Sequence, residues 1–202
     1  MTVTVDDVNL KAIADAIRSK NGTEETYKPS EMADAIYEIN TDIGDIKQIL
    51  EVPDENIVSI TVPEGVTKLK PYCFDEHDNL ESVSLPSSLV EIGGSAFANC
   101  RKLSTINLPD GLVNLYARAF EECDALTEIT IPEGVTQIYE YTFGWCDNLT
   151  TVTFKGKPTS IKGNAFAYCP NLTTINVPWA EGEVANAPWG STGDAVNYNY
   201  EG

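Results

Sequence analysis

The sequence predicts an α/β chain leaning to β, in which a solenoid lies between an N-terminal helical hairpin and a C-terminal cap. Three observations predict it. From residue 57 to residue 178 the sequence repeats every 23 residues, and a period of this length is typical of stacked repeats. Within each repeat a short segment alternates apolar and polar residues, which indicates a half-buried strand. Before residue 40, apolar residues follow helical spacing instead. We therefore expect one parallel sheet of five full turns and a partial sixth.

Four columns of residues carry the period. They are Leu80, Leu103, Leu126, Leu149 and Leu172; Phe74, Phe97, Phe120, Phe143 and Phe166; Pro63, Pro86, Pro109 and Pro132; and Cys100, Cys123, Cys146 and Cys169. Each repeat is expected to form a strand ended by proline, a second extended piece, and a tight helical turn carrying Ala-Phe. After the prolines, Gly65, Gly111 and Gly134 are expected to permit a positive φ. Stacking buries about six apolar residues per turn, at roughly 1.5–3 kcal/mol each.

This pattern resembles the BspA-like leucine-rich repeat, the 23-residue type in which Ala-Phe and a cysteine replace the Asn-rich signature of other leucine-rich repeats. The resemblance covers residues 57–178, with His77 in place of the first cysteine and Lys155 in place of the fifth proline. It implies a right-handed solenoid that serves as a protein- or glycan-binding surface on bacterial or viral exteriors. It carries no catalytic residues.

The N-terminal segment, residues 1–40, is expected to form a helical hairpin for attachment or assembly. Two sets of apolar residues lie on single helical faces: Leu10, Ile13, Ala14 and Ile17, then Met32, Ala35, Ile36 and Ile39. The string 9–39 resembles a segment of bacteriophage tail-associated proteins, which implies contacts with other tail proteins through residues 1–50. Residues 41–56 continue the spacing with Ile43, Ile46 and Leu50. They form either a helical linker packed on the hairpin and the solenoid, or an oligomeric neck that would make a homotrimer.

The C-terminal segment, residues 179–202, is expected to cap the solenoid. A solenoid needs its last turn covered. Trp179 and Trp189 supply large apolar side chains, and Val196, Tyr198 and Tyr200 alternate as in a strand. The segment also resembles the closing sequence of phage-borne repeat proteins. The alternative is that Trp189 and the two tyrosines form a sugar platform.

Composition excludes several partner classes. The 31 acidic and 13 basic residues give a net charge of −18, which disfavours nucleic acid and anionic membranes. No apolar run is long enough to insert into a membrane, and residues 1–7 lack the features of a signal peptide. The cysteines are expected to be reduced, buried thiols, without zinc. We expect no cofactor, no metal site and no catalysis, because no nucleophile, base or phosphate loop stands out.

Two faces of the solenoid are candidate ligand surfaces. The strand face carries short hydroxyl and amide side chains, which also simply suit a solvated sheet. The other face gathers aromatic residues at variable positions, namely Tyr116, Tyr139, Tyr141, Trp145 and Tyr168. They are the candidate binding residues, because exposed aromatic side chains are common anchors of protein and glycan contacts. The alternative is that they shield the wide side of the solenoid from water.

The function expected from these features is non-enzymatic binding. The first hypothesis is a bacteriophage tail or receptor-binding protein, located in the virion tail and extracellular when it functions, whose solenoid contacts a host surface protein or glycan. The alternative hypothesis is a bacterial cell-surface adhesin or protein-interaction module of the same repeat family. A purely structural spacer is a third possibility.

Overall fold

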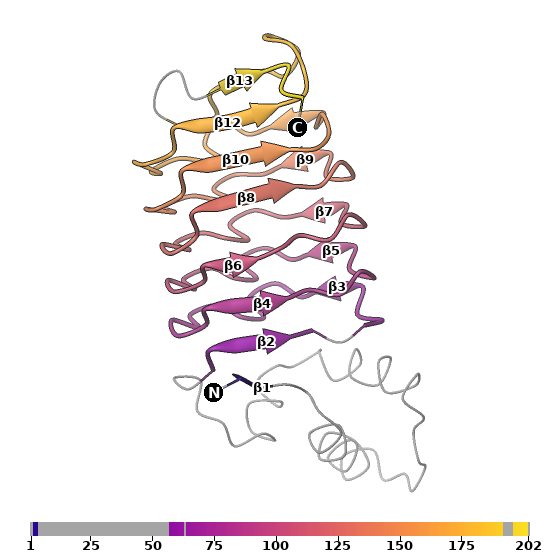
Figure 1. Ribbon diagram of the computed structural model, residues 1–202, viewed down its shortest axis with the longest axis vertical. Helices are drawn as coiled ribbons and strands as arrows, with labels where there is room; N and C mark the ends of the chain where they lie inside the picture. Colours follow the sequence, from indigo (N-terminus) through magenta and orange to yellow (C-terminus); the bar gives the residue numbers. More distant parts are fainter. Residues whose placement is uncertain (1, 4–56, 63, 192–195, 202) are drawn as a thin grey trace, which may run out of the picture.

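The computed structural model describes residues 2–3, 57–62, 64–191 and 196–201, and these form a parallel β-solenoid (Figure 1). A long front sheet and a shorter return sheet line its two sides. The front strands are β1 (Thr2–Val3), β2 (Ser59–Thr61), β4 (Ser82–Ser84), β6 (Thr105–Ile106), β8 (Glu128–Ile131), β10 (Thr151–Phe154), β12 (Thr174–Val177) and β13 (Val196–Tyr198). The return strands are β3 (Lys68–Leu69), β5 (Glu91–Ile92), β7 (Asn114–Leu115), β9 (Gln137–Ile138) and β11 (Ser160–Ile161). In Figure 1 the chain climbs as a right-handed coil.

The register follows the 23-residue period. Ser59 pairs with Ser82, and Thr151 pairs with Thr174, in parallel. The front strands are ordered β1-β2-β4-β6 and β8-β10-β12-β13, and the return strands β3-β5-β7 and β9-β11. Both sheets are therefore interrupted at one level, between the third and fourth turns. The third and fourth turns remain hydrogen-bonded to each other at the corner where the chain passes from a return strand to the next front strand. At this corner the Phe120 N–H of the third turn donates to Thr142 O of the fourth turn at 2.9 Å.

The α component of the predicted fold class is wrong: the described residues form strands and turns and contain no helix. The Ala-Phe segments are tight turns, closed by bonds such as Ala96 N–H to Gly93 O at 3.2 Å. They cannot propagate as helices, because two columns adopt a positive φ: Tyr72, Ser95, Arg118 and Tyr141, and Glu76, Asn99, Glu122, Trp145 and Tyr168. The predicted hairpin and the linker or neck at 41–56 lie outside the described residues, apart from Thr2–Val3, which form β1 and pair with β2.

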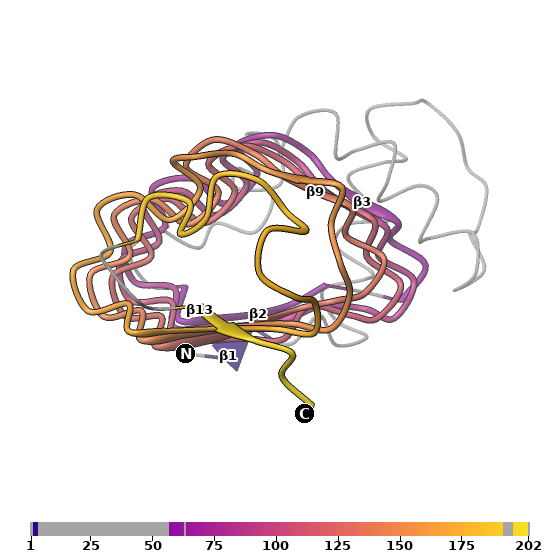
Figure 2. The ribbon, with the colours of Figure 1, turned by 90° about the horizontal axis from the view of Figure 1, so that it is seen from above.

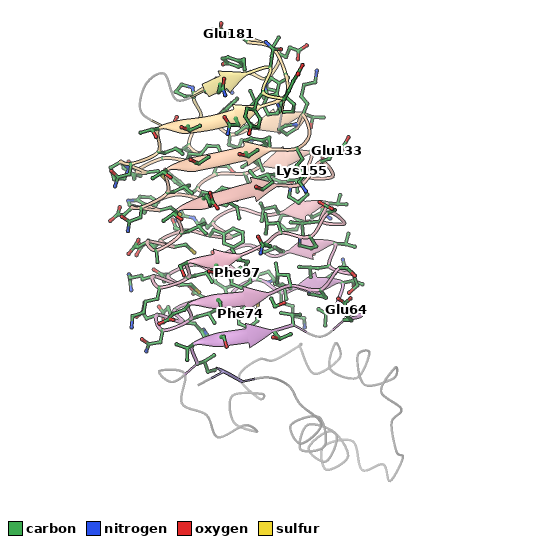
Figure 3. The ribbon with its side chains drawn as sticks, viewed as in Figure 1. Glu64, Phe74, Phe97, Glu133, Lys155 and Glu181 are labelled. Carbon is green, nitrogen blue, oxygen red and sulfur yellow. The ribbon has the colours of Figure 1, made fainter. Side chains whose placement is uncertain are left out.

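The core is a stack of repeated side chains (Figure 3). The rings of Phe74, Phe97, Phe120, Phe143 and Phe166 follow one another at centroid distances of 5.2, 5.3, 5.4 and 5.6 Å. The interplanar angles do not exceed 18°, so the rings are nearly parallel. Such contacts add about 0.5–1.5 kcal/mol per pair to the burial of the rings. The phenylalanine column is thus a continuous aromatic stack along the solenoid axis.

The cysteines are free and buried, which confirms the prediction of reduced structural thiols. Cys100, Cys123, Cys146 and Cys169 each donate to the carbonyl of the phenylalanine 26 residues earlier, at 2.9–3.2 Å. Burial raises the pKa of the Cys73 and Cys100 thiols to about 12. The thiols therefore pack and bond between turns, and at Cys73 and Cys100 thiolate chemistry at neutral pH is disfavoured.

The glycines after the proline column have two different roles. Gly65 has a φ of 94°, as expected, whereas Gly111 and Gly134 do not have a positive φ. Gly134 is required by space instead: a Cβ there would lie 2.7 Å from Leu112 O in the preceding turn. A close approach between turns, not a left-handed backbone, thus explains this glycine.

The C-terminal segment closes the solenoid. Trp189 lies 23 residues after Phe166, has no exposed surface, and donates its indole N–H to Ala185 O at 2.7 Å. Trp179 packs edge-on against Phe154 at 5.3 Å. β13 pairs with β12, and Figure 2 shows the chain between these strands turning inward across the end of the coil, while the C-terminus leaves on the outer side. Both tryptophans are thus buried against the last turns of the core, and the ring of Trp189 has no exposed face to offer a sugar.

Candidate binding surfaces

The front face is polar, as expected from the strand alternation. Short side chains lie above the strands, and some bond between turns: Asn176 Nδ2 donates to Thr153 Oγ1 at 3.2 Å, and Asn197 Nδ2 donates to Asn176 Oδ1 at 3.0 Å. Near the C-terminal end of the solenoid, the polar side chains of the front face therefore hydrogen-bond to one another.

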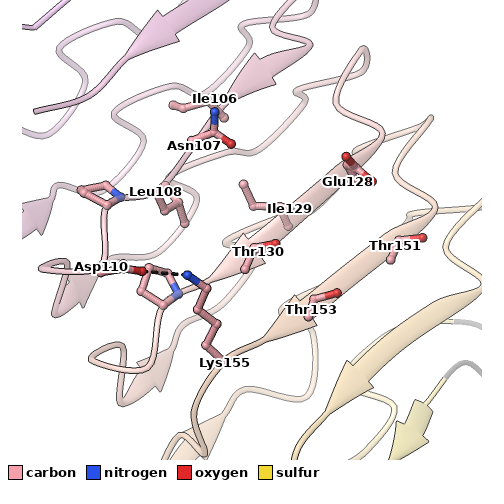
Figure 4. Close-up of a pocket in the computed structure, with 12 residues that line it drawn as sticks. Ile106, Asn107, Leu108, Asp110, Glu128, Ile129, Thr130, Thr151, Thr153 and Lys155 are labelled. Atoms are coloured by element: carbon pink, nitrogen blue, oxygen red, sulfur yellow. Dashed lines mark hydrogen bonds and ion pairs between the residues drawn. The ribbon is translucent and has the colours of Figure 1, made fainter. Parts of the chain in front are cut away.

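A hollow of about 470 Å³ opens on the front face where the sheet is interrupted. Figure 1 shows β8 set further from β6 than the other neighbouring front strands are from each other. In Figure 4, Asn107, Glu128, Thr130 and Thr153 surround the opening. The sequence did not predict this hollow, because identical spacing in all repeats predicts a continuous ladder.

Lys155, which replaces a proline, lies at one side of the hollow. Its Nζ donates to Asp110 Oδ1 at 2.8 Å, and so the side chain reaches back across the fourth turn to the third (Figure 4). The side chains are 52% and 84% exposed, so the pair contributes at most about 1 kcal/mol. The missing proline was the one sequence signal that pointed to this place.

The five candidate aromatic residues form a pair and a triad. Tyr116 and Tyr139 follow β7 and β9, and their ring centroids lie 5.6 Å apart. Tyr141 lies 5.0 Å from Trp145, and Trp145 stacks on Tyr168 at 4.6 Å with an interplanar angle of 20°. Tyr168 is 61% exposed, and the other four residues are partly exposed. We call Tyr141, Trp145 and Tyr168 the aromatic edge.

The aromatic edge occupies left-handed backbone positions. Tyr141, Trp145 and Tyr168 have φ values of 54°, 55° and 62°. Glycine and asparagine adopt this conformation most readily, and a bulky residue there costs about 1–2 kcal/mol. None of the three belongs to the buried core. Large aromatic side chains are thus held at the surface, at positions where glycine would strain the backbone less.

Charges surround the aromatic edge. The Arg118 guanidinium lies over the Tyr141 ring at 4.9 Å and donates to Glu121. Arg101 bridges Asp78 at 2.9 Å and Glu122 at 2.8 Å. These ion pairs are partly exposed, so each is worth at most about 1 kcal/mol.

Asp124 lies among these charges. Burial raises the pKa of its carboxyl, and the nearby carboxylate of Asp147 raises it further, against the opposing effect of Arg101. Carboxylates therefore outnumber cations on this side of the edge.

The described residues offer little to catalysis. His77 is buried, and its Nδ1 lies 3.1 Å from Asp75 O. No group of three or more His, Cys, Asp and Glu side chains in the described part of the chain could hold a metal ion. Nor does that part include a helix long and apolar enough to cross a bilayer.

The repeats decide the family. Residues 67–185 match the model described as the BspA type leucine rich repeat region, in six copies. The chain belongs to the BspA-type leucine-rich repeat family. This agrees with the columns of leucine, phenylalanine and cysteine in the core.

Two solved structures of leucine-rich proteins are similar to this chain. A leucine rich cell surface protein from Faecalibacterium prausnitzii is 31% identical over 68% of this chain and 35% of its own length, with a TM-score of 0.59. A leucine rich repeat protein from T. pallidum is 29% identical over 60% of this chain and 59% of its own length, with a TM-score of 0.53. This chain thus spans about a third of the first protein. No curated protein matches it.

Proposed function

We propose that this BspA-type chain is a non-enzymatic adhesion or protein-interaction module of a bacterial cell surface. The repeat family supports this proposal, because solenoids of stacked repeats offer extended surfaces for binding. The similar Faecalibacterium prausnitzii structure is described as a cell surface protein, which supports the location. The net charge of −18 keeps such a module away from nucleic acid and anionic lipid.

The aromatic edge is the contact region in this proposal, and the observation that carries it is the placement of Tyr141, Trp145 and Tyr168 at left-handed positions outside the core. Residues in strained conformations persist where function requires them. Rigid aromatic side chains with polar tips are also the commonest hot spots of protein interfaces. Tyr116 and Tyr139 extend the proposed contact along the neighbouring turns.

The bacteriophage reading has less support. It proposes a virion tail location, contacts with other tail proteins through residues 1–50 and a trimeric neck, and it rests on resemblances of the two terminal segments. The family match and the similar structures concern the repeats. They favour the bacterial surface module, whose partner is a surface protein or a glycan of a host.

The test compares three proteins on arrays of glycans and of host surface proteins. They are the native chain, the double variant Trp145→Gly, Tyr168→Gly, and the control Tyr72→Gly. Glycine adopts a left-handed backbone freely, so all three are expected to fold. Tyr72 shares the turn position of Tyr141 and is 67% exposed, but it lies three turns away. We expect the double variant to lose binding that the control retains. Equal binding by all three proteins would contradict the proposed contact region.

A further inference from the structure

We propose that the aromatic edge binds a cationic peptide segment, one that carries arginine or lysine side chains. The inference rests on the proposed function and names the chemistry of the partner. It is carried by the stacked rings of Trp145 and Tyr168 and by two carboxylates, that of Asp147, two residues after Trp145, and that of Asp124, one turn earlier.

The rings provide the first half of the site. Trp145 and Tyr168 form a stack at 4.6 Å, and Tyr168 is 61% exposed. The face of an aromatic ring attracts a cation, and tryptophan and tyrosine attract it most strongly. The edge already holds one such contact, since the Arg118 guanidinium lies 4.9 Å from the centroid of Tyr141. A guanidinium from a partner would repeat this arrangement on the next rings of the same edge.

The carboxylates provide the second half. Asp147 follows Trp145 by two residues, Asp124 occupies the same position one turn earlier, and Glu122 occupies the position of Trp145 one turn earlier. Arg101 pairs with Glu122. Among the described residues, no ion pair involves Asp124 or Asp147. Burial raises the pKa of Asp124, and the carboxylate of Asp147 raises it further, so these two carboxylates lie close enough to repel each other.

The charge pattern selects among partners. An anionic glycan on the rings would be repelled by the carboxylates of Asp147, two residues after Trp145, and of Asp124, one turn earlier. A neutral glycan would stack on the rings but would gain nothing from the carboxylates. A peptide with arginine or lysine side chains uses both halves at once, because its cations lie over the rings and pair with the carboxylates.

The first experiment measures the local charge at Trp145. The chain has three tryptophans, and Trp179 and Trp189 are buried, so ionic quenchers in water act mainly on Trp145. The quenching constant of each ion is divided by its value for free N-acetyltryptophanamide. On this relative scale we expect caesium to quench the fluorescence of Trp145 better than iodide does. Asp147→Asn should reduce the difference more than Glu133→Gln. Glu133 is the control because it is exposed and follows β8, whereas Asp147 precedes β10, so the two residues lie at opposite ends of the front strands (Figure 3). Iodide quenching equal to or better than caesium quenching would overturn the proposal.

The second experiment measures peptide binding by the same fluorescence. The probes are a Gly-Ser peptide with arginine at alternate positions and the same peptide with citrulline or glutamate at those positions. We expect the arginine peptide to bind most tightly. Trp145→Gly should weaken the binding of this peptide about fivefold or more, and binding by that variant, which lacks the fluorescent side chain, is measured by calorimetry. Because Trp145→Gly leaves the net charge unchanged, general attraction to an acidic chain cannot explain such a loss. Tyr72→Gly should bind as the native chain does.

Two outcomes of the peptide experiment would refute the inference: equal binding of the citrulline peptide, or equal binding by Trp145→Gly and the native chain. The proposed function fails separately. If the double variant loses array binding but the arginine peptide has no preference, the contact region stands and its cationic partner does not. If the double variant keeps array binding while the arginine peptide still depends on Trp145, the cationic site stands and the surface function at this edge does not.

Discussion

Replacing Phe120 with alanine should remove the centre of the aromatic stack. Phe120 has no exposed surface, and its ring lies between Phe97 at 5.3 Å and Phe143 at 5.4 Å. Truncation of a buried phenylalanine costs about 3–5 kcal/mol. Phe120→Leu keeps most of the apolar volume and loses the two ring contacts, so its cost should be about 1–3 kcal/mol. Domains are stable by only about 5–15 kcal/mol, so the alanine variant should lose a large fraction of its stability.

The assay is urea unfolding followed by the fluorescence of the buried Trp179 and Trp189. The matched control is Phe74→Ala, because Phe74 is only partly buried and stacks on one phenylalanine, Phe97. We expect this control to cost less than half as much as Phe120→Ala, with an unchanged dependence on urea concentration in both variants. The reasoning is refuted if the two alanine variants lose equal stability, or if Phe120→Ala costs less than about 1 kcal/mol.

Three further predictions concern the turns, the thiols and the cap. Gly134→Ala places a Cβ 2.7 Å from a backbone oxygen and should cost about 1–3 kcal/mol in urea unfolding, whereas Gly163→Ala, whose Cβ meets nothing closer than 4.0 Å, should be neutral or slightly stabilising. The Cys73 and Cys100 thiols have a pKa of about 12 in the folded chain against an ordinary 9.0. The unfolded chain therefore releases these two protons first, and the contribution of the two thiols to the free energy of unfolding should be constant below pH 9 and fall from there toward pH 12, by up to about 1.4 kcal/mol per thiol and pH unit; a free energy of unfolding that does not fall above pH 9 in urea unfolding would contradict this. Trp189→Ala opens the cap and should cost about 3–5 kcal/mol, with faster hydrogen exchange in β12 than in β4; uniform exchange would contradict the capping role.

The solenoid could be predicted from the sequence because its physical cause is periodic. Residues that recur every 23 positions lie above one another in the stack, so their columns reveal the register directly. The turns could not be predicted in the same way. Arg118 and Trp145 have a positive φ, which neither residue type signals, so the sequence alone predicts a helical turn for the Ala-Phe segment. Trp189 was also recognisable in principle, since it keeps the spacing of the phenylalanine column.

The candidate surfaces were predictable in part. The pairs Tyr116 with Tyr139 and Trp145 with Tyr168 follow from the 23-residue spacing. The contact between Tyr141 and Trp145 depends on the left-handed turn that joins them, so the sequence alone did not separate the five aromatic residues into a pair and a triad. The hollow at the level of β6 and β8 depends on how two turns separate, and Lys155 in place of a proline is the one departure from the repeat pattern that lies beside it.

The aromatic edge and the front hollow are two alternative contact regions, and site-specific photocrosslinking distinguishes them most directly. A benzophenone side chain would replace Tyr168 in one protein and Thr153, beside the hollow, in another. Each protein would be irradiated with the surface molecule that the native chain binds. The account predicts crosslinks from position 168 and none from position 153. Crosslinks from position 153 alone would contradict it.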